Sequence, residues 1–141
     1  MINTLLAAAT TLLAPKAIRE TEKNTEFEDI ALFSNALLML KDLFVPMKRS
    51  PGKERRDAYE ARLEELSLTD LPCFGQKGTI KRFPEYRVDY QGEQFWCENH
   101  IKFGTGWDPR NRFRIYYYWH EEDQLLIIGH MPNHLDNMLT N

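Results

Sequence analysis

Cysteine is scarce in this chain of 141 residues, which holds only Cys73 and Cys97. So few cysteines exclude a disulfide framework, although one bond between them stays an alternative, and we expect a reducing, cytoplasmic location. Cys97 and His100 have a Cys-x-x-His spacing, but no second tight pair accompanies them. On a strand, an offset of three also puts two side chains on opposite faces. We therefore expect no metal and no cofactor, and we interpret Cys97 as a small core residue.

An excess of positive charge is also missing. The chain has 18 Lys and Arg against 21 Asp and Glu, a net charge of −3. The molecule as a whole therefore has no field that would hold nucleic acid non-specifically, and any anion site must come from local charge. A glycine-rich phosphate loop is missing as well, because Gly104-Thr-Gly106 is too short and no helix start follows it. No motif for a cysteine or serine nucleophile is present.

The apolar N-terminal stretch, residues 1–15, does not fit a signal peptide, because the first cation is Lys16. It is also too short to span a bilayer, so we expect no membrane partner. Its apolar residues recur at helical spacing, which predicts a helix. That helix could complete the core, the interpretation we favour, or it could bind a partner or form a homodimer.

Two further helices are predicted. Thr25 and Glu28 form a capping box, so a helix should begin at Thr25 or Glu26 and end at Pro46. Another should run from about Lys53 to Leu66, mostly as a solvated, charged face.

Strand patterns begin after residue 70. We expect a short strand at 79–83, then alternating strands at 86–90 and 94–103 around a Gln91-Gly92 turn, and finally a hairpin of strands 113–120 and 125–128. The sequence therefore predicts one α+β domain over residues 1–141, with a helical part (1–70) packed on a small antiparallel sheet (71–141).

The first strand of the hairpin should have two different faces. Phe113, Ile115, Tyr117 and Trp119 alternate with Arg114, Tyr116, Tyr118 and His120. The second strand, Leu125 to Ile128, is apolar on both faces, as expected of a central strand. It leads to two histidines, His130 and His134.

A local excess of positive charge precedes and enters this hairpin. Lys102, Arg110, Arg112 and Arg114 stand against one acid, Asp108. Such cations can hold phosphates. The aromatic rings available to stack on bases are Tyr116, Tyr118, Trp107 and His120. His130 or His134 can move a proton. The structural alternative is ordinary: Arg114 pairs with Glu98 or Asp89 across the sheet, the tyrosines are half-buried, and the histidines cap a strand end.

The hairpin sequence resembles the C-terminal end of proteins of the RelE/ParE toxin superfamily. The resemblance lies in Arg114 followed by Ile-Tyr-Tyr-Tyr, a charged turn, and then Leu-Leu-Ile-Ile-Gly-His130. That resemblance covers roughly residues 93–135. It implies a small α+β domain whose helices pack on a twisted antiparallel sheet. Members typically begin with a strand, whereas helical spacing predicts a helix here. Many members cleave mRNA, commonly in the ribosomal A site, without a metal.

Carried over by position, the resemblance implies that Arg114 contacts the scissile phosphate and that His130, or less directly His134, is the acid or base. Lys102, Arg110 and Arg112 match basic positions that would hold RNA, and we add Tyr116 and Tyr118 as stacking residues. The expected function is a cytoplasmic RelE-like toxin or defence endoribonuclease. The alternative is a non-catalytic module that binds an antitoxin or another protein through the N-terminal helices or the aromatic sheet face.

Overall fold

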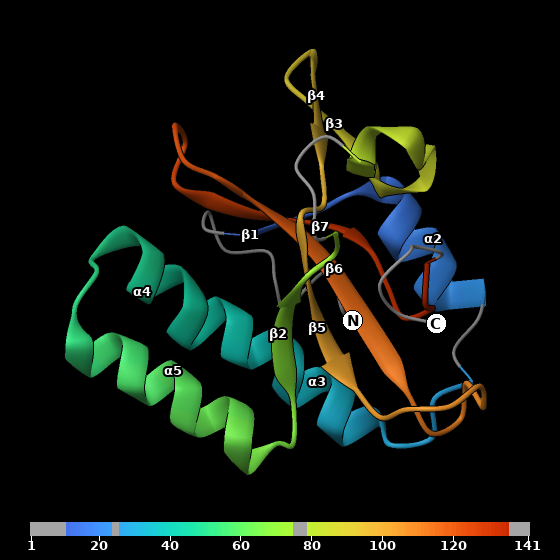
Figure 1. Cartoon of the computed structure of the whole chain (residues 1–141), viewed down its shortest axis with the longest axis horizontal. Helices are drawn as coiled ribbons and strands as arrows, with labels where there is room; N and C mark the ends of the chain where they lie inside the picture. The colour runs from blue at the N-terminus through green and yellow to red at the C-terminus, as the bar shows by residue number, and fades with distance from the viewer. Residues whose placement is uncertain (1–10, 24–25, 75–78, 136–141) are drawn as a thin grey trace.

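The computed structural model describes residues 11–23, 26–74 and 79–135. Its centre is a five-stranded sheet in the order β1-β7-β6-β5-β2, beside which β3 and β4 form a separate two-stranded sheet (Figure 1). The strands are β1 (Thr11–Leu13), β2 (Thr69–Pro72), β3 (Arg87–Tyr90), β4 (Glu93–Trp96), β5 (Asn99–Phe103), β6 (Phe113–His120) and β7 (Leu125–His130). With the helices described below, this is an α+β fold, as the sequence predicts.

The edge strand β1 corrects two expectations. Residues 11–13 pair in parallel with Leu126 to Ile128 of β7, so the sheet is mixed rather than wholly antiparallel. They also form a strand where we predict a helix, while residues 1–10 of that predicted helix lie outside the described residues. Leu13 is buried and Leu12 is 41% exposed. A short apolar run satisfies helical and strand spacing equally well, and pairing with β7 decides between them.

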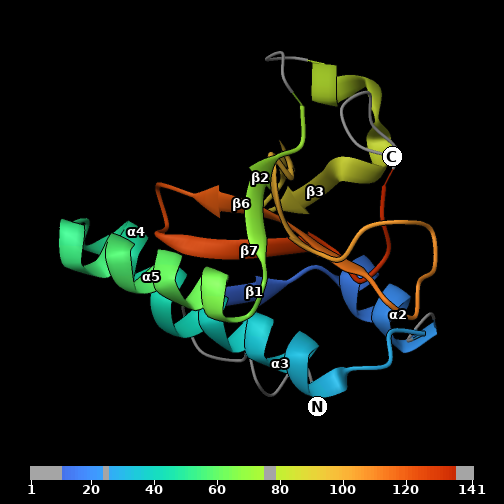
Figure 2. The ribbon, with the colours of Figure 1, turned by 60° about the horizontal axis from the view of Figure 1, so that its bottom comes forward.

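The helices cover one face of the five-stranded sheet. They are α2 (Pro15–Lys23), α3 (Ile30–Met39), the π-helical turn η1 (Leu40–Phe44), α4 (Val45–Arg49) and α5 (Lys53–Glu65). Figure 2 shows α3, α4 and α5 together on one side of the sheet, with α2 at one end. Helix α5 confirms the prediction over 53–66. The helix α2 was not predicted, because its polar sequence buries only the small side chains of Ala17 and Thr21.

The long central helix begins later and ends later than predicted. It begins at Ile30, where the Asp29 carboxylate accepts a hydrogen bond from the Leu32 backbone N–H, whereas Thr25 lies outside the described residues. Pro46 does not end it. Proline lacks an N–H and its ring crowds the carbonyl four residues earlier, and the preceding turn is widened, with Val45 N–H bonded to Leu40 O. Helical residues then continue to Arg49.

This central helix is apolar because it is part of the core. By length and composition alone, residues Ile30–Arg49 could cross a membrane, a test that the core helix of a soluble protein also passes. Here Phe33, Leu37 and Phe44 are buried in one cluster with side chains of β6 and β7. Packing on the sheet therefore accounts for the composition without a bilayer.

A second layer lies on the other side of the sheet. It contains the β3–β4 hairpin and two 3₁₀ turns, η2 (Thr79–Arg82) and η3 (Pro84–Tyr86) (Figure 2). The strand predicted at 79–83 is therefore wrong. The predicted strand 94–103 is two strands in two sheets, and β2 was missed because it is a short edge strand that ends in proline. The Gln91-Gly92 turn is confirmed, with positive φ at both residues.

Gly129 allows β7 to approach this second layer closely. A Cβ at Gly129 would lie 2.4 Å from Cys97 Sγ and 3.0 Å from a methyl carbon of Val88. We therefore expect Gly129→Ala to lower the free energy of unfolding by about 1–3 kcal/mol, measured by urea denaturation. Adding Cys97→Ala should recover part of that loss, because the clashing sulfur is then gone. A single Gly129→Ala variant within 0.5 kcal/mol of wild type would contradict the close packing.

Candidate phosphate-binding site

The site lies on the far face, by which we mean the face of the five-stranded sheet opposite α3, α4 and α5. Strand register places His100 of β5 opposite Tyr116 of β6, and Tyr116 opposite His130 of β7. Lys102 and Arg114 form the next cross-strand pair. Since side chains alternate along a strand, these residues share the far face. The helix-side core holds Ile101, Phe113, Ile115 and Tyr117 instead, which confirms the predicted alternation of β6.

Arg114 is buried without an acidic partner among the described residues. The residue is 2% exposed, and its Nη1 donates to the carbonyl oxygens of Phe103 (2.9 Å) and Phe113 (2.8 Å). Its Nε has no hydrogen-bond partner. Asp89, one of the two acids expected to pair with it, interacts with Arg87 instead, and Glu98 forms no ion pair with it. Burial lowers the pKa of Arg114, and the charge of Arg112 acts in the same direction.

Arg112 and Lys102 accompany Arg114, as the sequence predicts. Both are half-buried, and Lys102 lies opposite Arg114 in the strand register. The Nε and Nη1 atoms of Arg112 are buried without a hydrogen-bond partner. Buried N–H groups nearly always donate to an acceptor. The described residues supply none for these donors, so we expect the acceptor to come from elsewhere.

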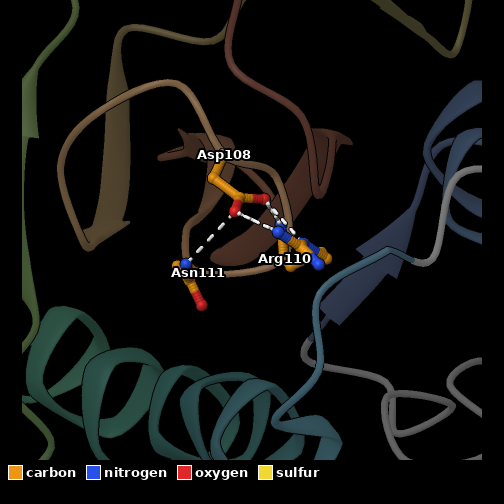
Figure 3. A network of polar contacts seen from close by, with 3 residues as sticks. All are labelled: Asp108, Arg110 and Asn111. Atoms are coloured by element: carbon orange, nitrogen blue, oxygen red, sulfur yellow. Dashed lines mark hydrogen bonds and ion pairs between the residues drawn. The ribbon is translucent and has the colours of Figure 1, made fainter.

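Arg110 differs from the other cations of this group. It is exposed, and its guanidinium donates to both carboxylate oxygens of Asp108, with Nε 3.1 Å from Oδ1 and Nη2 2.9 Å from Oδ2 (Figure 3). Asn111 contacts the same carboxylate. The single acid of the segment therefore neutralises Arg110 rather than Arg112 or Arg114. Its contact with RNA stays a prediction, and a phosphate would have to compete with Asp108 for it.

The structure separates the histidines into two environments. His100 is 1% exposed, and burial lowers its pKa to about 4, with Arg114, His134 and Lys102 acting in the same direction. His130 is 8% exposed, and burial also lowers its pKa to about 4. The charges that act on His130 belong to Lys16 and Glu20 of α2.

The aromatic ring of Tyr116 lies between these two histidines. Its centroid is 5.2 Å from that of His100 and 5.8 Å from that of His130. The charges of Arg114 and His134 act on the pKa of His100, whereas those acting on His130 come from Lys16 and Glu20. Sequence reasoning did not assign His100 to this site, although alternation along β5 places it on the same face as Lys102.

The two tyrosines assigned to base stacking differ in exposure. Tyr116 is completely buried, and its hydroxyl accepts a hydrogen bond from the Leu135 backbone N–H (2.8 Å), so its expected stacking on a base does not fit this structure. Tyr118 is half-buried and stacks on Phe95, with ring centroids 4.9 Å apart. Trp107, in the loop between β5 and β6, is 73% exposed.

The lowered pKa values of His100 and His130 predict a loss of stability in acid. Each histidine has a folded pKa of about 4 against an ordinary 6.5, so the unfolded chain binds more protons between those values. The free energy of unfolding should therefore fall as the pH falls from about 6.5 to about 4, by roughly 2–3 kcal/mol per histidine. Urea denaturation across this range measures the slope. His100→Gln should have a shallower slope, and equal slopes would contradict the assignment.

No group of three or more metal-ligating side chains is present in the described part of the chain. Comparison with family models, with curated proteins and with solved structures finds no match. The interpretation of the far face therefore depends on the chemistry of its own residues.

Proposed function

We propose that this protein is a RelE-like toxin or defence component that binds RNA at the far-face cations and cleaves it without a metal. One observation supports this most strongly: buried guanidinium nitrogens of Arg112 and Arg114 donate to no acceptor, and neither residue has an acidic partner among the described residues. A phosphodiester supplies both the missing charge and several acceptor oxygens. Phosphate contacts from arginine and lysine are also the usual basis of RNA affinity.

The proposed reaction is transfer of the phosphodiester to the neighbouring ribose 2′-OH. The 2′ oxygen forms a bond to phosphorus, the bond to the 5′ oxygen breaks, and the products are a 2′,3′-cyclic phosphate and a 5′-OH. Arg114 stabilises the charge that develops on the phosphoryl oxygens, and Lys102 and Arg112 hold the backbone. His130 or His134 takes the 2′-OH proton and, once protonated, returns a proton to the leaving 5′ oxygen. Of these two, His134 is the one whose charge acts on His100 together with that of Arg114.

The order of the elements also supports the proposal. The resemblance leads us to expect a strand before the first helix, and β1 occupies that position, followed by helices and then by the remaining strands. Helices on one face of a small sheet agree with the expected architecture.

Access to the site requires movement. The segment after β7 runs beside these residues: Pro132 O accepts a hydrogen bond from the Arg114 backbone N–H, and Leu135 bonds to Tyr116. Because Arg114 is 2% exposed, RNA contacts it only after neighbouring residues, such as Leu135 beside Tyr116, move aside. This coverage favours the second candidate, a non-catalytic module that binds a protein partner such as an antitoxin.

The test is cleavage of a short single-stranded RNA by the purified full chain. Cleavage without added metal, giving 2′,3′-cyclic phosphate ends, is expected, and a matched RNA with one 2′-deoxy residue should resist cutting at that position. Fluorescence anisotropy with the same RNAs measures binding separately. Neither binding nor cleavage would contradict the proposal and favour the interaction module.

A further inference from the structure

We propose, on the basis of the function above, that His100 is the histidine of the phosphate site and that Cys73 is the residue that positions it. In this arrangement the His100 Nε2–H donates to a phosphate oxygen held beside Arg114. His100 is 1% exposed, yet its Nε2 has no hydrogen-bond partner among the described residues. The unpartnered Nε of Arg114 is independent of it and belongs to the neighbouring cross-strand pair.

Cys73 determines which nitrogen of His100 carries the proton. Its backbone N–H donates to Glu98 O (2.8 Å), which holds residue 73 beside the start of β5. Its sulfur lies 3.5 Å from His100 Nδ1. Burial raises the pKa of the Cys73 thiol, so the thiol keeps its proton, and in the arrangement we infer it donates that proton to Nδ1. The neutral imidazole must then carry its own proton on Nε2.

The groups around this Nε2–H lack an acceptor. The charges that act on His100 come from Arg114 of β6, Lys102 of β5 and His134 after β7, and no carboxylate is among them. The atoms left without partners at Arg112 and Arg114 are donors too. One tetrahedral anion with several oxygens supplies both the acceptors and the negative charge that these cations lack, whereas a neutral ligand supplies acceptors only.

His130 does not fit this role. Its Nε2 is also buried without a hydrogen-bond partner in the described part of the chain, but the ring of Tyr116 lies between it and His100, and the charges acting on it belong to α2. Because an anion beside His100 favours its protonated form, phosphate binding should raise the pKa of His100 and leave that of His120 unchanged. His120 is the matched control, since its Nδ1 accepts a hydrogen bond from the Asp123 backbone N–H at the turn after β6.

The first experiment is nitrogen-15 NMR of the histidine rings in the wild-type full chain, with inorganic phosphate and the 2′-deoxy-substituted RNA as probes. We expect His100 to carry its proton on Nε2 when free, and its pKa to rise by at least one unit with either probe while His120 does not respond. A proton on Nδ1, or an unresponsive His100 in a chain that binds the RNA, would overturn the inference.

Variants test the same claim through affinity and pH dependence. His100→Gln should bind the RNA roughly tenfold more weakly, the effect of one charge-assisted hydrogen bond, while His120→Gln binds like wild type. Cys73→Ser keeps a donor and should retain the wild-type pH profile of cleavage, whereas Cys73→Ala should shift it. A Cys73→Ala profile identical to wild type would overturn the positioning role, and the wild-type NMR result decides if a variant fails to fold.

These outcomes separate the inference from the proposed function. RNA binding that needs Arg114 but not His100 overturns the inference and leaves the proposed function intact. A wild-type chain that binds neither phosphate nor RNA overturns both.

Discussion

Replacing Arg114 with methionine is expected to abolish RNA binding and cleavage without lowering the stability of the protein. Arg114 is 2% exposed and has no acid partner among the described residues, so the wild-type fold carries an uncompensated buried charge. Methionine keeps an unbranched apolar stem, although it is shorter than arginine, and it removes that charge. It also leaves the carbonyls of Phe103 and Phe113 without this donor, which offsets part of the gain.

The functional loss should be large. Two charge-assisted hydrogen bonds to a phosphate correspond to about 100-fold or more in affinity. Fluorescence anisotropy and urea denaturation of the same protein sample measure both quantities. Arg87→Met is the matched control, because Arg87 is exposed and pairs with Asp89. An Arg114→Met protein that loses several kcal/mol of unfolding free energy, or still binds RNA as wild type does, would show that the charge serves the fold and not a ligand.

Asp70→Ala should cause the largest loss of stability. Asp70 lies on β2, and its two carboxylate oxygens accept hydrogen bonds from the hydroxyls of Tyr59 on α5 (2.8 Å) and Tyr117 on β6 (2.6 Å). Both tyrosines are buried. Alanine would leave two buried hydroxyls without an acceptor, which we expect to lower the free energy of unfolding by roughly 3 kcal/mol.

Asp70→Asn provides the control for this network. Its amide keeps one acceptor oxygen, so it should lose only about half as much as alanine does. Urea denaturation of the two variants beside wild type gives the comparison. If Asp70→Ala unfolds at the wild-type urea concentration, the three elements are not held together by this carboxylate.

Local patterns predict the elements whose partners are close in sequence. The hairpin of β6 and β7, the turn at Gln91-Gly92 and helix α5 each follow from spacing within one segment. The strand β1 does not, because it exists through pairing with β7, more than a hundred residues away. The separation of β4 from β5 also depends on which sheet each joins, which alternation alone cannot distinguish.

The sequence predicts most of the residues of the candidate site, but not which of them contact one another. Arg112, Arg114 and Lys102 lie together because they are near one another on two paired strands. The neutralisation of Arg110 by Asp108 and the burial of Tyr116 depend on side-chain contacts that residue types do not specify. His100 joins Arg114 through cross-strand register, so it became visible only when β5 and β6 were paired.

The most direct test of the central claim is induced expression in a bacterial host, with wild type and Arg114→Met compared for growth and mRNA integrity. We predict growth arrest with fragmented mRNA for wild type. The variant should grow normally with intact mRNA while accumulating as soluble protein. Normal growth and intact mRNA with wild type, or arrest and fragmentation that persist in the variant, would contradict the assignment of this site to RNA cleavage.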